Sequence, residues 1–133
     1  MGTEARLVTV ALEVADLDRS VALYREAFGL DLHVADHHGG EHGSDDRWTS
    51  GRHAATSWTA GAYLHFALCE AKESPTSGAQ IALRVDDLDA AHRRAMAAGA
   101  EIVHGPRREP WGTSARYRDL DGNVVELTQP PPS

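Results

Sequence analysis

Apolar and polar residues alternate in two stretches of the chain that resemble each other. The first is TVALEVADLD, from Thr9 to Asp18, and the second is QIALRVDDLD, from Gln80 to Asp89. Six of the ten aligned positions carry the same residue. A period of two predicts β-strands with one packed face. The recurrence of such a stretch, followed each time by similar patterns, predicts a tandem duplication.

Each predicted strand runs into a pattern typical of an amphipathic helix. Asp16 and Asp87 are suited to the N-cap, where a carboxylate accepts from free backbone amides. Gly29 and Gly99 stand where a left-handed C-cap would end each helix. The apolar stripes at helical spacing are Leu17, Val21, Tyr24 and Phe28 in the first helix, and Leu88, Ala91, Ala95 and Met96 in the second.

Further strands are expected after each helix. Residues Ala62–Cys69 alternate, and Arg116–Gln129 reads as a hairpin turned at Asp121-Gly122. Leu32–Ala35 and Ala54–Thr59 can also be strands. Each copy is therefore expected to have the order β-α-β-β-β. The fold class is α+β, with tandem modules forming curved mixed sheets around a cleft and the helices on the outer face.

Length and composition predict one domain that spans residues 1–133. Its expected parts are a first module at 7–73, a linker at 74–78, a second module at 79–129 and a flexible tail at 130–133. Hydrophobic residues make up 41% and charged residues 25%, which is typical of a globular protein. No apolar run is long enough for a membrane span, and no signal peptide is expected.

Charge and cysteine content narrow the range of partners and compartments. The formal net charge is −7 and no basic stripe occurs, which argues against nucleic acid as a partner. The single cysteine, Cys69, excludes an intrachain disulfide and fits the cytoplasm. We expect no membrane association.

The strand faces opposite the helices carry the polar residues. They are Thr9, Glu13, Tyr63, His65, Cys69, Gln80, Arg84, Glu126 and Thr128. If the two sheets curl toward each other, these side chains line one shared cleft. The duplication would make Thr9 equivalent to Gln80, and His65 equivalent to Glu126. Glu13 and Arg84 would either pair with each other across the cleft or clamp a polar ligand, since an arginine fork suits carboxylates.

Three segments together carry a family resemblance. They are VALEVADLDRSVALYREAFGL (10–30), IALRVDDLDAAHRRAMAAGAEI (81–102) and EPWGTSARYRDLDGNVVEL (109–127). The chain resembles the glyoxalase, bleomycin-resistance and extradiol-dioxygenase superfamily, also called vicinal oxygen chelate proteins, from about Leu7 to Thr128. The resemblance implies U-shaped sheets around a cleft, and a homodimer whose clefts each take one module from each subunit.

The resemblance also implies four positions for a divalent metal such as Ni, Co, Mn, Fe or Zn. Here these positions match Thr9, His65, Gln80 and Glu126. Threonine is a poor ligand for a transition metal, so His65, Gln80 and Glu126 would make a weak, open site. Alternatively, these three residues hydrogen-bond to each other or to a ligand. We favour the absence of a functional metal.

The stretch ADHHGGEHGSDD, from Ala35 to Asp46, is rich in histidine, glycine and acids. No HxxxH helix or cysteine pair accompanies it. We therefore predict a solvated loop, which in functional terms would be a flap over the cleft. Tryptophans in neighbouring segments could stack on a flat organic molecule. They are Trp48, Trp58 and Trp111, of which Trp111 is the strongest single prediction.

The sequence thus predicts a small-molecule-binding protein of the bleomycin-resistance type. It would sequester an aromatic or cationic drug or metabolite in a dimer-interface cleft, a role related to antibiotic resistance. The alternative is a metal-dependent lyase, isomerase, dioxygenase or thiol transferase that uses His65, Gln80 and Glu126. Glu126 or Glu13 would then be the catalytic base. A third possibility is a scaffold that only dimerises.

Overall fold

The computed structural model of the chain describes residues 4–38, 50–58 and 64–132. Within these ranges the chain forms eight strands and two helices. In chain order they are β1 (Thr9–Val14), α1 (Leu17–Glu26), β2 (His33–His38), β3 (Ser50–Trp58), β4 (Leu64–Glu70), β5 (Gln80–Arg84), α2 (Leu88–Ala97), β6 (Glu101–Glu109), β7 (Gly112–Arg118) and β8 (Val124–Gln129). None of the helices in the described part is long and apolar enough to cross a membrane.

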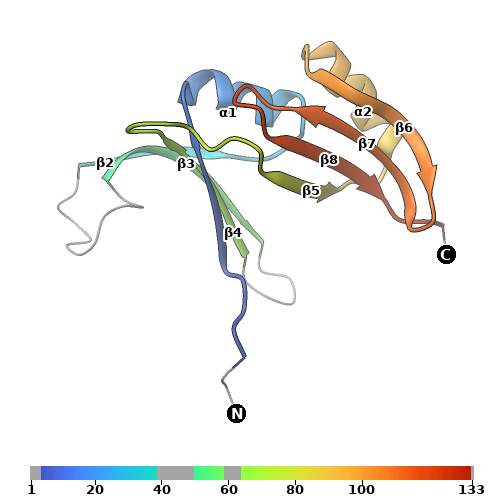
Figure 1. Cartoon of the computed structure of the whole chain (residues 1–133), viewed down its shortest axis with the longest axis horizontal. Coiled ribbons are helices and arrows are strands. Elements are labelled where there is room, and N and C mark those ends of the chain that lie inside the picture. Colours follow the sequence, from blue (N-terminus) through green and yellow to red (C-terminus); the bar gives the residue numbers. More distant parts are fainter. Residues whose placement is uncertain (1–3, 39–49, 59–63, 133) are drawn as a thin grey trace.

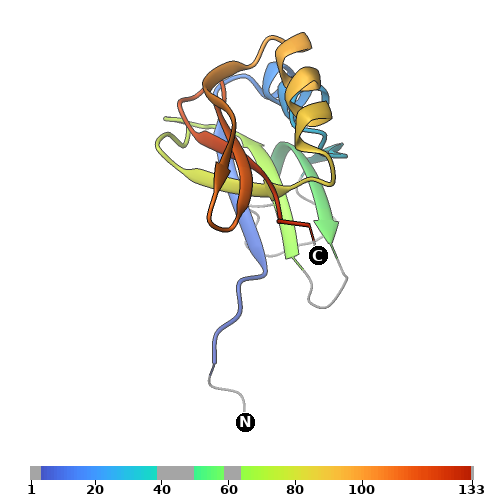
Figure 2. The ribbon, with the colours of Figure 1, turned by 90° about the vertical axis from the view of Figure 1, so that its right-hand side faces the viewer.

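The strands form two four-stranded sheets, seen in two orientations in Figures 1 and 2. The first has the order β1-β4-β3-β2 and the second β5-β8-β7-β6. In each sheet the first pair is parallel and the other pairs are antiparallel. The predicted α+β fold with a repeated β-α-β-β-β order is confirmed. The predicted loop at Ala35–Asp46 begins inside β2, and its residues from 39 onward lie outside the described part.

Strand register corrects one predicted equivalence between the modules. Thr9 pairs with His65 and Ala11 with Ala67, whereas in the second module Ala82 pairs with Glu126. Because Ala11 and Ala82 are the matching residues of the repeat, Glu126 is equivalent to Ala67. The predicted equivalence of His65 and Glu126 is wrong by two residues, since the sequence alignment relied on turn glycines. A two-residue shift leaves both side chains on the same face of their sheets.

Both helices begin and end as the sequence predicts. The carboxylates of Asp16 and Asp87 each accept a hydrogen bond from the backbone N–H three residues later, at 3.1 Å. Gly29 and Gly99 have φ values of 75° and 80°, a left-handed conformation that glycine adopts without a steric penalty. Met96 differs from the prediction because its side chain is 48% exposed. It follows buried Ala95 on α2, and one residue of helix turns it away from the packed face.

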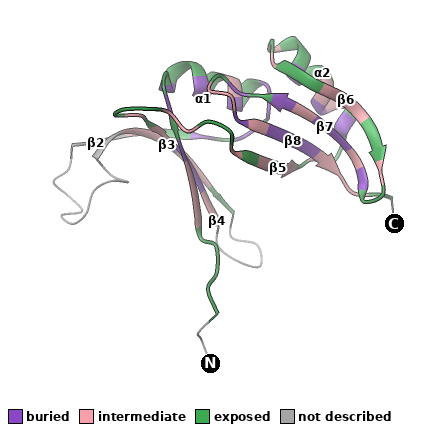
Figure 3. Cartoon of the chain, viewed as in Figure 1, coloured by how far each residue is buried: buried purple, intermediate pink, exposed green. Residues whose placement is uncertain are grey.

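The packed faces of the two modules form one continuous core (Figure 3). Tyr24 of α1 contacts Phe28 and Phe66, with ring centroids 5.2 and 5.9 Å apart. Phe28 in turn lies 5.7 Å from the ring of Tyr117, which belongs to β7 of the second module. Aromatic pairs at these distances stabilise a core beyond their buried area. The end of α1 therefore packs against both modules.

A buried hydrogen-bond cluster, centred on Asp119, also joins the modules. The hydroxyl of Tyr24 donates to Oδ2 of Asp119 at 2.7 Å. The side-chain amide of Asn123 donates to the same oxygen at 2.9 Å, while the backbone N–H groups of Asp121 and Asn123 donate to Oδ1. The motif DLDGN thus shapes the β7–β8 turn and attaches this turn to α1.

Tyr117 gives the fold a predicted sensitivity to alkaline pH. Burial raises the pKa of its hydroxyl from 10.0 to about 12, and this hydroxyl lies 2.7 Å from Nδ1 of His92. Between these two values the unfolded chain has lost the proton that the folded chain keeps. The contribution of Tyr117 is complete below pH 10 and disappears as the pH rises through 12. Urea unfolding over this range should show a loss of about 2 to 3 kcal/mol from this group.

The control for this prediction is Tyr117→Phe, which removes the titrating hydroxyl. Its free energy of unfolding should start lower at neutral pH and should fall less steeply above pH 10. An equally steep fall in Tyr117→Phe would assign the alkaline sensitivity to other groups.

Candidate functional site

A cavity of about 830 Å³ lies between the two modules within one chain. The first module contributes residues from β1, the segment 28–30 after α1, β3 and β4, and the second contributes β5 and the first turns of α2. Its apolar lining includes Val10, Phe28, Leu30, Leu64, Phe66, Ile81, Leu83 and Val85. A volume of this order and a mostly apolar wall are typical of sites for small organic molecules.

A few polar and aromatic side chains interrupt this apolar wall. Trp58, at the end of β3, is 41% exposed and offers an indole face at the rim. His65 and Arg84 line the cavity from β4 and β5, and Arg94 lines it from α2. Asp86 and Asp87 line it from the segment just before α2. Such a wall can bury an aromatic body while a small number of polar groups fixes its orientation.

The structure brings together only some of the predicted site residues. Trp58, His65 and Arg84 all line the cavity. Trp111 does not; it lies in the β6–β7 turn and is 55% exposed. Trp48 and Tyr63 fall outside the described residues.

Glu13 and Arg84 form no ion pair with each other in the part of the single chain that the structure describes. Glu13 is on β1, where its backbone exchanges hydrogen bonds with Thr76. Arg84 is on β5, an edge strand of the other sheet. An attraction between their charges does not hold the two modules together.

His65 lies between two hydroxyl-bearing residues on its sheet. Thr9 is its neighbour on β1 and Ser57 is its neighbour on β3. The Oγ atom of Ser57 is 2.9 Å from Nδ1 of His65. The imidazole is thus oriented by a side chain from the adjacent strand.

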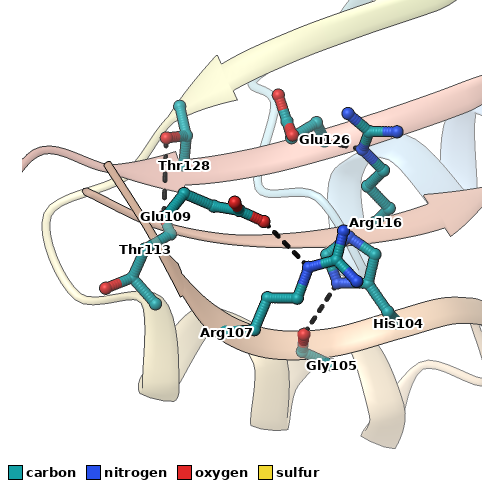
Figure 4. Close-up of polar contacts among 8 residues, drawn as sticks. All are labelled: His104, Gly105, Arg107, Glu109, Thr113, Arg116, Glu126 and Thr128. Atoms are coloured by element: carbon teal, nitrogen blue, oxygen red, sulfur yellow. Dashed lines mark hydrogen bonds and ion pairs between the residues drawn. The ribbon is translucent and has the colours of Figure 1, made fainter. Parts of the chain in front are cut away.

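The second sheet carries a row of charged residues on the face opposite α2. We call this surface the second polar face; its residues are Arg84, Glu126, Thr128, Ser114, Arg116, Arg118, Glu101, His104, Arg107 and Glu109. Register shifts flank His104 in β6, between Ile102 and His104 and between His104 and Arg107. Bulges of this kind re-aim side chains, and both His104 and Arg107 come to lie opposite residues of this face (Figure 4).

Ion pairs hold the charges of the second polar face in place. Nε of Arg116 is 3.2 Å from Oε2 of Glu126, and Nε of Arg107 is 2.8 Å from Oε1 of Glu109 (Figure 4). Glu126 is only 9% exposed. An opposite charge is therefore available to Glu126 without a metal ion.

His104 is held in one tautomer. Its Nδ1 lies 2.8 Å from the carbonyl oxygen of Gly105. A carbonyl oxygen only accepts hydrogen bonds, so Nδ1 carries the proton and Nε2 of the neutral ring has a free lone pair. Nε2 is buried and has no hydrogen-bond partner among the described residues.

The residues at the predicted metal positions do not fit a transition-metal site. No group of three or more His, Cys, Asp or Glu side chains that could hold a metal occurs in the described part of the chain. Thr9 is a weak donor, Glu126 is paired with Arg116, and its equivalent in the first module is Ala67, which has no donor atom. His65, Gln80 and Glu126 stay on two separate sheets.

Cys69 has no feature of a reactive thiol. It lies inside β4 opposite Glu13 and His53. Burial and the negative charge of Glu13 raise the pKa of the thiol. A raised pKa lowers the fraction of thiolate, which is the nucleophilic form.

Seven residues of the second polar face were not predicted from the sequence: Ser114, Arg116, Arg118, Glu101, His104, Arg107 and Glu109. Ser114 and Arg116 alternate with buried Ala115 and Tyr117, and this period of two is a signal that could have revealed their face. His104 and Arg107 have no such signal, because bulges around Gly105-Pro106 break the alternation.

Comparison with known proteins agrees with this architecture. A model of the Glyoxalase/Bleomycin resistance protein/Dioxygenase superfamily matches residues 6–127. The chain belongs to this superfamily. The uncharacterized protein YetH of Bacillus subtilis (strain 168) is 26% identical over 121 residues, which cover 91% of this chain and 95% of YetH.

Two solved structures of proteins from Streptomyces sp. CB03234 are similar to the chain. TnmS3, described as an antibiotic binding protein, is 30% identical, with a TM-score of 0.71 and coverage of 98% of this chain and 99% of TnmS3. A glyoxalase/bleomycin resistance protein is also 30% identical, with a TM-score of 0.66 and coverage of 93% and 100%. The likeness extends over both modules in each case.

Proposed function

We propose that this superfamily member binds an aromatic small molecule and sequesters it without chemical change. The observation that carries the proposal is the mostly apolar cavity of about 830 Å³ with Trp58 at its rim. The antibiotic-binding relative TnmS3 supports a ligand of drug or metabolite size. Stacking on an indole and burial of apolar surface would supply most of the affinity.

The donor set favours binding over metal-dependent catalysis. A metal at the predicted positions would have to draw Glu126 away from Arg116, and the register equivalent of Glu126 in the first module, Ala67, offers no donor atom. The loss of this ion pair would leave the partly buried Arg116 guanidinium, whose side chain is 36% exposed, without its carboxylate. The charges also disfavour a cationic ligand, since the four arginines of the second polar face outnumber its three glutamates.

A homodimer remains part of the proposal. Thr9 and His65 lie on one sheet and Gln80 and Glu126 on the other. A second copy would place the polar face of β1 and β4 of one chain against the second polar face of the other. This arrangement would enclose a ligand that extends beyond the cavity. We also place the protein in the cytoplasm, away from membranes and nucleic acid.

Tryptophan fluorescence tests the binding proposal. We expect 2-naphthamide to quench wild-type fluorescence, and Trp58→Phe to remove most of this quenching and weaken binding about tenfold. Trp111→Phe is the matched control, and it should keep both the quenching and the wild-type affinity. Light scattering on the same samples should give twice the mass of one chain.

Two outcomes would contradict this picture. Loss of quenching in Trp111→Phe instead of Trp58→Phe would move the ligand to the β6–β7 turn. Absence of both quenching and calorimetric heat for a panel of neutral and charged naphthalenes would contradict the binding function.

A further inference from the structure

The second polar face has a surplus of positive charge in an acidic protein. It carries Arg84, Arg107, Arg116 and Arg118 against Glu101, Glu109 and Glu126, while the whole chain has a formal net charge of −7. The three glutamates are each paired with one arginine, namely Arg118, Arg107 and Arg116. Arg84 is left without an acidic partner in the described part of the chain. The local field therefore attracts an anion.

The paired arginines are oriented with their terminal nitrogens free. Arg116 and Arg107 each meet their glutamate through Nε. Among the described residues, the terminal nitrogens of these two side chains have no hydrogen-bond partner. Figure 4 shows both guanidinium groups, with Glu126 and Glu109 beside them. An arginine held in this way is pre-organised to donate to a further oxygen anion.

Ser114 adds an unpartnered hydroxyl beneath this surface. It lies in the same row as Arg107, Thr128 and Arg84. Its side chain is 1% exposed, and its Oγ has no hydrogen-bond partner among the described residues. A buried hydroxyl without a partner costs free energy, and an oxygen atom of a ligand would remove that cost.

The cavity and the second polar face meet at β5. Ala82 and Arg84 line the cavity, and they also pair with Glu126 and Thr128 of the polar face. Neighbouring strands are about 4.8 Å apart, so Arg116 is about 10 Å from Ala82 across β8. A ligand whose ring fills the cavity can thus extend a substituent past the small side chain of Ala82.

We propose that the ligand is an aromatic carboxylic acid, whose carboxylate is bound on the second polar face by Arg84 and Arg116, with Ser114 as a further donor. This inference rests on the proposed binding function and names the chemical class of its ligand. The aromatic ring remains in the cavity beside Trp58. A carboxylate matches the fork of a guanidinium group better than any neutral substituent does.

The experiment compares 2-naphthoate with its neutral isostere 2-naphthamide by calorimetry. On the wild type we expect the acid to bind about 10-fold more tightly than the amide. Arg84→Gln and Arg116→Gln should each weaken the binding of 2-naphthoate about 10-fold. Both variants should keep the affinity for 2-naphthamide within about 2-fold of the wild-type value. Added salt should weaken the binding of 2-naphthoate and should leave the binding of 2-naphthamide unchanged.

Arg93→Gln is the matched control, because it removes the same charge from an exposed position on α2 outside the cavity lining. It should leave both dissociation constants unchanged. Thermal unfolding checks the fold of Arg116→Gln, which leaves Glu126 without its partner. Arg84→Gln gives an independent test, because Arg84 is exposed and its loss unpairs no acid in the described part.

The outcomes separate the two proposals. Equal affinity for acid and amide on the wild type, or equal losses for both probes in Arg84→Gln and Arg116→Gln, would overturn the carboxylate site and leave the binding function standing. Failure of both probes to bind the wild type would overturn the binding function and the carboxylate site with it.

Discussion

We expect Asp119→Ala to lower the free energy of unfolding by about 3 to 5 kcal/mol, close to the limit of what one substitution does. Asp119 is 6% exposed, and its carboxylate accepts four hydrogen bonds from Tyr24, Asp121 and Asn123. Its removal leaves buried donors without partners in both modules. Urea unfolding followed by far-UV circular dichroism measures the loss.

Leu120→Ala is the control for Asp119→Ala, because it alters the same turn at a side chain that is 47% exposed. It should cost less than about 1 kcal/mol. Tyr24→Phe removes only one of the four hydrogen bonds and should cost about 1 to 3 kcal/mol. If Asp119→Ala has the same free energy of unfolding as Leu120→Ala, the carboxylate does not join the modules as described.

We expect Ala90→Trp to abolish ligand binding, which is the largest effect on function that a single substitution should have. Ala90 lies on α2 and lines the cavity. An indole at this position occupies space that an aromatic ligand would fill, and overpacking of the site costs more than a small ligand recovers. The affinity for 2-naphthamide should fall by at least about 100-fold, measured by calorimetry.

Ala97→Trp is the matched control, since Ala97 is on the same helix but exposed and away from the cavity. Its affinity should equal that of the wild type. Thermal unfolding of both variants checks the helix. Unchanged binding in a folded Ala90→Trp would exclude the cavity as the site and would direct attention to a cleft between two subunits.

The fold could be predicted from the sequence because its signals are local. Alternation in β1 and β5 and the caps at Asp16 and Asp87 depend on residues a few positions apart. Each of these predictions agrees with the structure. Met96 shows the limit of a helical stripe, since an apolar residue at its border can point to solvent.

The site could be predicted only in part because it depends on register and tertiary packing. Alternation identifies the face of His65 and Glu126, but it does not determine which residues pair, so the equivalence shifted by two positions. The cavity depends on how two modules pack, which no local pattern encodes. The sequence therefore ranks Trp111 above Trp58, although Trp58 lines the cavity and Trp111 does not.

The bulges of β6 have an evolutionary consequence. Strands β7 and β8 keep a regular ladder, whereas β6 already tolerates two breaks in its pairing beside His104. Insertions or deletions there would exchange the side chains presented at the β6 edge of the second polar face while the rest of the sheet is preserved. Related proteins could diversify their chemical preferences through this single edge strand, and libraries that vary its length offer a direct route to new specificities.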